Sequence, residues 1–195
     1  MPMNGGVTPA PSSWTRLWRH VLGAVVLAAL GLSTYAADTP FLPLTMVELG
    51  IHESSHWATI WAPRVLYVMA GSIGQVLVPL LVSWHLARRM GDPVGGALGL
   101  GWAGLSAHGV AVYIADAPYE RLELVGGNIH DWAYLLGPEQ FNDLGAAAGL
   151  ASAVRGAGIL MVCAGVVWCL WRPVRAYTAD PVVEPREGGL HWSAD

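Results

Sequence analysis

His52 and His56 stand four residues apart in the run His52-Glu53-Ser54-Ser55-His56, which has the form HExxH. In a helix, two histidines at this spacing project from one face and can bind one Zn²⁺ through imidazole nitrogens. Glu53 would lie beside them, where its carboxylate can accept a proton from a metal-bound water. The motif therefore predicts a zinc site with two histidine ligands and a glutamate base. The competing interpretation is a hydrogen-bonded polar seam between helices in which both histidines are neutral.

A catalytic zinc usually takes three protein ligands and keeps a fourth position open for water. The best source of the third ligand is the run His130-Asp131-Trp132. Asp131 also precedes an apolar stretch that could form a short helix, and it could serve as the N-cap of that helix. In that case His130 would be the freer ligand, so both His130 and Asp131 are candidates.

Other polar side chains are weaker candidates for the same site. His108 and Asp116 belong to a later, mostly apolar run and fall roughly on one side of a helix. Glu48 stands one turn before the first histidine, where it could accept a hydrogen bond from a ligand or act as an extra ligand. Ser72 and Gln75 form a polar break in another apolar run and could line the site or bond across helices.

The composition is typical of an integral membrane protein. Of the 195 residues, 54% are hydrophobic and only 12% are charged, whereas soluble domains usually carry about twice that charged fraction. The net charge is -4, and there is no basic patch, which argues against a nucleic-acid partner. Two cysteines are too few for a disulfide framework or a Cys-rich zinc site.

Four apolar runs are each close to the ~20 residues that cross a bilayer core as a helix. They comprise residues 21–37, 65–87, 93–115 and 144–171, and only the last contains a charged residue, Arg155. The sequence therefore predicts an all-α, polytopic membrane helix bundle with four spanning helices, and the lipid bilayer as its surroundings.

The HExxH motif lies in a fifth segment, residues 44–61, which is bounded by Pro43 and Pro63. Its polar side chains recur on one helical face, and apolar side chains cover the rest. These polar residues are Glu48, His52, Ser55, His56 and Thr59. We expect this embedded helix to enter from the outer side without crossing the membrane, with its polar face toward the bundle.

Arginines at the ends of the runs predict the orientation. Arginines precede the first run and follow the second and the fourth, and the positive-inside rule places these ends in the cytoplasm. The acidic opposite ends, and the metal site near them, would then face outside. The first run resembles a secretory signal, but an uncleaved anchor is the favoured interpretation. Residues 1–15 and 173–195 are then cytoplasmic tails of a bundle formed by residues 16–172, in what we expect to be a bacterial cytoplasmic membrane.

One protein family shares this pattern. An HExxH motif on a membrane-embedded helix, followed by a Gly/Ser-containing polar segment and an Asp near a later helix start, resembles the site-2 protease class of intramembrane zinc metallopeptidases. The resemblance covers His52 to His56, and Asp131 more loosely. It implies that His52, His56 and Asp131 are zinc ligands and that Glu53 is the catalytic base. That class carries its Asp before a Gly on a later transmembrane helix, whereas Asp131 here precedes Trp132.

The leading functional hypothesis is a membrane-embedded zinc metallopeptidase that hydrolyses a peptide bond in a membrane-associated substrate. Zn²⁺ would polarise the scissile carbonyl while Glu53 activates water. The alternative is a non-enzymatic metal-binding membrane protein, such as a sensor, a metal chaperone or a subunit of a larger complex. Copper or iron would also suit the candidate ligands. A third interpretation is a structural subunit that binds no metal.

Overall fold

The computed structural model describes residues 13–125 and 129–179, and within these ranges the chain forms helices and no strand. The predicted all-α class is therefore confirmed. The elements in chain order are α1 (Ser13–Tyr35), α2 (Leu42–Ala58), α3 (Arg64–Arg88), α4 (Pro93–Asp116), α5 (Asp131–Leu136), the short 3-10 helix η1 (Leu144–Ala146) and α6 (Ala147–Ala179).

Among the described residues, four helical segments are long and apolar enough to cross a membrane. They are Leu17–Tyr35 of α1, Arg64–Arg88, Pro93–Asp116 and Leu144–Trp171, the last formed by η1 and most of α6. They coincide with the four runs that the sequence singled out. The helix α2 is not among them, because it has only 17 residues and one of its faces is polar. The chain thus has the architecture of an integral membrane protein with one additional, shorter helix.

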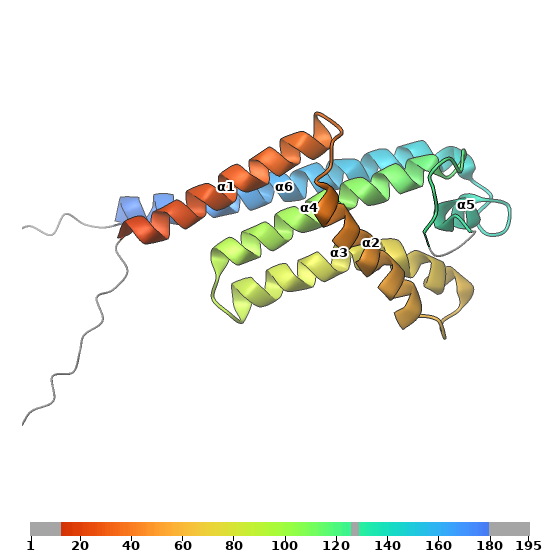
Figure 1. Ribbon diagram of the computed structural model, residues 1–195, viewed down its shortest axis with the longest axis horizontal. Helices are drawn as coiled ribbons and strands as arrows, with labels where there is room; N and C mark the ends of the chain where they lie inside the picture. Colours follow the sequence, from red (N-terminus) through yellow and green to blue (C-terminus); the bar gives the residue numbers. More distant parts are fainter. Residues whose placement is uncertain (1–12, 126–128, 180–195) are drawn as a thin grey trace, which may run out of the picture.

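The four long helices lie side by side along the length of the molecule, and α2 lies obliquely against α3 and the neighbouring part of α4 (Figure 1). The start of α1 lies close to the α3–α4 connection, because the guanidinium of Arg19 is 3.5 Å from the carboxylate of Asp92. It also meets the last part of α6, where Nδ1 of His20 is 2.9 Å from the carbonyl oxygen of Cys169. The arginine-bearing ends that the sequence grouped together therefore do share one end of the bundle.

The central helix is α4, which packs against α1, α3 and α6. Ala97 and Ala103 on it are fully buried. Gly104 of α4 faces Gly158 of α6 so closely that a Cβ on Gly158 would lie 2.8 Å from the Gly104 carbonyl oxygen. Small residues let membrane helices approach to backbone contact, and this crossing fixes α4 against the longest helix.

The helix that carries HExxH is shifted slightly from its predicted limits of 44–61. It begins at Leu42, with Pro43 in the first turn, where the missing N–H of a proline costs no helical hydrogen bond. It ends at Ala58, and Pro63 is the N-cap of α3. The buried residues of α2 are Glu48, His52 and His56, so its polar face is turned inward.

The predicted tails lie mostly outside the described residues. Of the N-terminal tail, only residues 13–15 are described, and they begin α1. The predicted C-terminal tail starts at residue 173, but α6 continues as a helix to Ala179. The Gly126-Gly-Asn run before the predicted third ligand also lies outside the described residues.

Candidate metal centre

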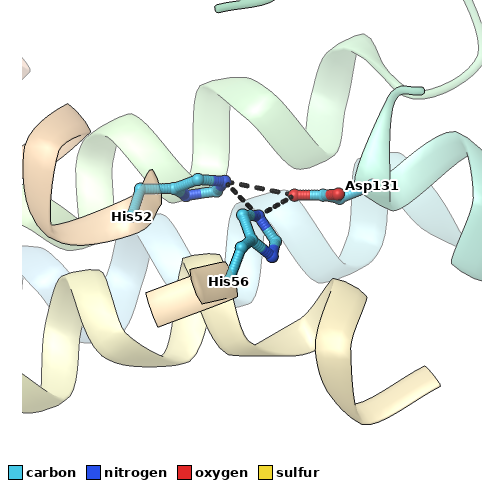
Figure 2. Close-up of side chains that lie close together, drawn as sticks. All are labelled: His52, His56 and Asp131. Carbon is cyan, nitrogen blue, oxygen red and sulfur yellow. Dashed lines mark hydrogen bonds and ion pairs between the residues drawn. The ribbon is translucent and has the colours of Figure 1, made fainter. Parts of the chain in front are cut away.

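Three buried side chains meet at one point between α2 and the start of α5 (Figure 2). Nε2 of His52 and Nε2 of His56 each lie 3.1 Å from Oδ2 of Asp131. The two Nε2 atoms are also 3.1 Å apart. We call His52, His56 and Asp131 the triad. Their three atoms form a nearly equilateral triangle of potential metal ligands.

Both histidine rings are oriented through their other nitrogen. Nδ1 of His56 lies 2.8 Å from the carbonyl oxygen of Tyr67, and Nδ1 of His52 lies 3.2 Å from Oε1 of Gln75. A carbonyl oxygen of the backbone or of a glutamine amide can only accept a hydrogen bond. Each Nδ1 therefore carries the ring proton and donates the hydrogen bond. This leaves both Nε2 lone pairs directed into the triad. Metal-binding histidines are held in the same way, with one ring N–H donated to a carbonyl or carboxylate oxygen.

The hydrogen-bond pattern bears on the interpretation of a neutral polar seam. With both Nδ1 atoms protonated, neutral rings of His52 and His56 present two lone pairs to the carboxylate of Asp131, and no proton is left to join them. Three acceptors 3.1 Å apart in a buried site repel one another. A further proton or a metal ion is therefore required at this point to hold the three atoms together.

The dimensions and the donor set fit a zinc ion. With metal–ligand distances of about 2.0–2.1 Å, tetrahedral ligand atoms lie roughly 3.3 Å apart, close to the 3.1 Å edges of the triad. Two imidazoles and a carboxylate are three protein ligands, the number that catalytic zinc sites use while keeping a fourth position for water. Imidazole nitrogen also suits copper and iron, so the triad by itself does not select one transition metal.

The two residues proposed as alternative third ligands have different roles. Asp131 is the first residue of α5 and enters the triad, while His130 is the N-cap and its Nδ1 accepts from the N–H of Ala133 at 3.2 Å. The capping role considered for Asp131 therefore belongs to its neighbour. Nε2 of His130 lies 3.4 Å from Oδ2 of Asp116, outside the triad. Burial lowers the pKa of His130 and the Asp116 carboxylate opposes this, so burial favours a neutral ring.

A glycine of α3 makes room for the rings. A Cβ on Gly71 would overlap Nε2 of both His52 and His56. The next residue, Ser72, accepts a hydrogen bond from the indole N–H of Trp132 at 3.0 Å. This bond ties the first turn of α5, and with it Asp131, to the helix on which α2 packs.

The triad borders a cavity of about 530 Å³. Glu53, Tyr113 and Gln75 line it together with the triad residues. The remaining walls are largely apolar and come from α2, α3 and the segment before α5; they include Leu49, Val68, Leu122, Leu124, Val125 and Ile129. An apolar cavity with a few convergent polar groups is the usual form of a small-molecule or substrate site. The glutamate of HExxH thus shares one cavity with the candidate ligands.

The weaker candidates from the sequence lie elsewhere. Glu48 accepts a hydrogen bond from Ser106 of α4 at 2.8 Å and is not part of the triad. His108 belongs to a second polar cluster, in which its Nε2 lies 3.3 Å from Oδ1 of Asp38 and its Nδ1 lies 3.1 Å from Arg155. That guanidinium also donates to the carbonyl oxygen of Tyr35 at 2.8 Å. Neither Glu48 nor His108 can therefore contribute to the triad.

Three contributions to the site escaped the sequence reasoning. The Tyr67 carbonyl is a backbone group and has no sequence signal, and the space left by Gly71 depends on how α3 faces α2. Tyr113 carries no motif. Comparisons of the chain with protein-family models, curated proteins and solved structures found no match. The geometry of the triad and its cavity is thus the ground for any functional assignment.

Proposed function

We propose that this protein is a membrane-embedded zinc metallopeptidase that hydrolyses a peptide bond in a membrane-associated substrate. The observation that supports it is the triad of His52, His56 and Asp131, whose atoms lie 3.1 Å apart at a cavity that Glu53 also lines. The resemblance of the HExxH helix and Asp131 to the site-2 protease class supports the same reaction.

The chemistry follows from the positions of these groups. A zinc ion held by the triad would polarise the scissile carbonyl and lower the pKa of a bound water. Glu53 accepts a proton from the attacking water while the water oxygen bonds to the carbonyl carbon. As the C–N bond breaks, Glu53 passes this proton to the leaving nitrogen, and a carboxylic acid and an amine result. The proton of the acid then moves to the amine, which gives a carboxylate and an ammonium group. Atoms and charge balance with water as the only co-reactant.

The proposed setting is a bacterial cytoplasmic membrane with both termini in the cytoplasm. The triad lies toward the end of α4 opposite the Arg19–Asp92 contact, since Tyr113 near the C-terminal end of α4 lines the triad cavity. In this orientation the cavity opens in the outer half of the bilayer, and a substrate would reach it from the outer leaflet or its surface.

The first test is metal content. Purified wild-type protein should retain about one Zn²⁺ per chain, because three protein ligands hold it directly. The double variant His52→Ala/His56→Ala should lose it, while His85→Ala, an exposed histidine of α3, should keep it. Stoichiometric zinc in the double variant would show that the triad is not the metal site. Copper or iron in place of zinc would contradict the assigned metal.

The second test separates catalysis from metal binding. Glu53→Gln preserves size and hydrogen bonding but cannot act as a base, so zinc should remain while cleavage falls by about 10²–10⁴-fold. Complementation of a deletion strain reports this loss, and Glu123→Gln, another carboxylate that lines the cavity, is the matched control. A Glu53→Gln protein that complements fully with its metal bound would contradict the peptidase assignment.

A second candidate function is a non-enzymatic metal-binding membrane protein, such as a sensor, a metal chaperone or a subunit of a larger complex. One observation supports it: two imidazoles and a carboxylate whose atoms come together in this way can hold a transition metal whether or not a reaction follows. In this case the histidine variants should abolish the cellular phenotype, and Glu53→Gln should leave it intact.

A further inference from the structure

Tyr113 is the one tyrosine among the described residues whose hydroxyl contacts a residue of the triad. It lies in the last turn of α4, one turn before Asp116, and lines the cavity together with Glu53 and the two histidines. Its hydroxyl oxygen accepts a hydrogen bond from the backbone N–H of Asp131 at 3.0 Å. The phenol therefore stands directly beside the residue that supplies the carboxylate of the triad.

The ring of Tyr113 is held on two sides. It meets the ring of His52 edge-on, with centroids 5.8 Å apart, and it lies tilted against the ring of His130 at 4.2 Å. Together with the Asp131 contact, these neighbours restrain the ring and fix where the hydroxyl points. Positioning of this kind is what a catalytic hydrogen-bond donor needs, because it need not reorganise as the reaction proceeds.

The hydroxyl proton of Tyr113 is available to a molecule in the cavity. A phenol has one donor and can also accept, and the N–H of Asp131 uses only its accepting capacity. No described residue accepts the proton. Glu53, Asp131 and Tyr113 all line this cavity, so a molecule bound there can meet the candidate base, the candidate ligand and the phenol.

We propose that Tyr113 is a further catalytic residue, whose hydroxyl donates a hydrogen bond to the oxygen of the substrate carbonyl as that oxygen becomes an oxyanion. This inference rests on the proposed peptidase function and adds a second electrophilic group to it. No proton is transferred: the tyrosine stays protonated and stabilises negative charge that is larger in the transition state than in the bound substrate. A single donor of this kind typically contributes about 10²–10³-fold to kcat.

The test uses the full-length protein with Co²⁺ in place of zinc, since cobalt absorbs visible light and reports its ligands. Acetohydroxamate is the probe, because its carbonyl oxygen binds the metal where a substrate carbonyl oxygen would bind. Wild type, Tyr113→Phe and Tyr119→Phe are titrated first with Co²⁺ and then with the probe. Tyr119 is the matched control, because it is an exposed tyrosine just beyond the end of α4 that does not line the cavity.

We expect Tyr113→Phe to bind Co²⁺ with an affinity close to that of wild type and to bind acetohydroxamate about ten- to a hundredfold more weakly. Tyr119→Phe should match wild type in both titrations. Unchanged probe affinity in Tyr113→Phe would overturn the role of Tyr113 and leave the proposed function standing. Loss of Co²⁺ binding in this variant would also overturn it, since the hydroxyl would then act by holding Asp131.

Two other outcomes concern the proposed function itself. A wild-type protein that binds no Co²⁺ has no metal centre, and both proposals fail. A wild-type protein that binds Co²⁺ but shows no spectral change with acetohydroxamate has no open metal position, and both proposals fail in that case too.

Discussion

His56 and Asp131 are 75 positions apart in the chain, yet Nε2 of the first lies 3.1 Å from Oδ2 of the second. The two residues come from α2 and α5, and both helices pack against α3. On α3, Gly71 leaves space for the histidine rings and Ser72 accepts a hydrogen bond from Trp132, the neighbour of Asp131. The candidate metal centre therefore depends on how two short helices pack against one long helix.

The third ligand can be identified by comparing two neighbouring variants. Asp131→Ala should weaken zinc binding by more than about 100-fold, because even residues that only orient a ligand are worth 10–100-fold. His130→Ala should keep the metal but lower the free energy of unfolding by about 1 kcal/mol, the usual cost of losing an N-cap. Zinc titration and thermal unfolding of both proteins measure this. The opposite pattern would make His130 the ligand.

Gly71→Ala should disrupt the centre without touching a ligand. The added Cβ would overlap Nε2 of both His52 and His56, so the rings must move and the triad must open. We expect metal content to fall well below one ion per chain. Gly50→Ala is the matched control on α2, since a Cβ there meets nothing within 4 Å and alanine favours a helix. Equal zinc content in the two variants would contradict the observed approach of α2 to α3.

Removing the metal should destabilise the wild-type protein. A ligand that binds only the folded state stabilises it by about 2.7 kcal/mol at a free concentration 100 times its Kd. Treatment with a chelator should therefore lower the melting temperature, and added zinc should restore it. The His52→Ala/His56→Ala protein should melt at the same temperature with and without chelator. A chelator effect of equal size in that variant would point to a metal bound elsewhere.

His108→Ala should affect stability and leave the metal centre intact. The substitution removes the acceptor of Arg155 and the neighbour of Asp38 in the second polar cluster. Losing one hydrogen bond of the half-buried Arg155, which keeps its bond to the Tyr35 carbonyl, typically costs about 0.5–1.5 kcal/mol, and detergent-solubilised protein would show this as earlier thermal unfolding. Zinc content should stay at the wild-type value. Loss of zinc in this variant would connect the two clusters.

Reporter fusions test the orientation of the bundle. Fusions after residues 40 and 125 should report the outer side, and fusions after residue 90 and at the C-terminus should report the cytoplasm. The reason is that arginines cluster at the ends that the Arg19–Asp92 contact brings together, and such ends stay in the cytoplasm. An outer-side signal after residue 90 would mean that α2 crosses the membrane and that the metal centre faces the cytoplasm.

The sequence by itself determined the long helices and two of the three side chains of the candidate metal centre. Length and apolar composition decide whether a segment can cross a bilayer, so the four spanning segments were predicted from local runs of residues and the structure reproduces them. The spacing of His52 and His56 is equally local, because residues four apart share a helical face. Their inward direction followed from the polar face on which they lie, and both are buried in the structure.

Only the tertiary structure decided how the centre is completed. His130 and Asp131 are adjacent and both are plausible ligands and caps, so their roles depend on a shift of one residue at the start of α5. Because His130 takes the N-cap position, the carboxylate of Asp131 is free to point toward α2 and not toward its own helix. The Tyr67 carbonyl and the Gly71 gap likewise exist for the triad only once α2 lies on α3. These relationships join separate helices and are set by how the helices pack. No local pattern of residue types encodes that packing.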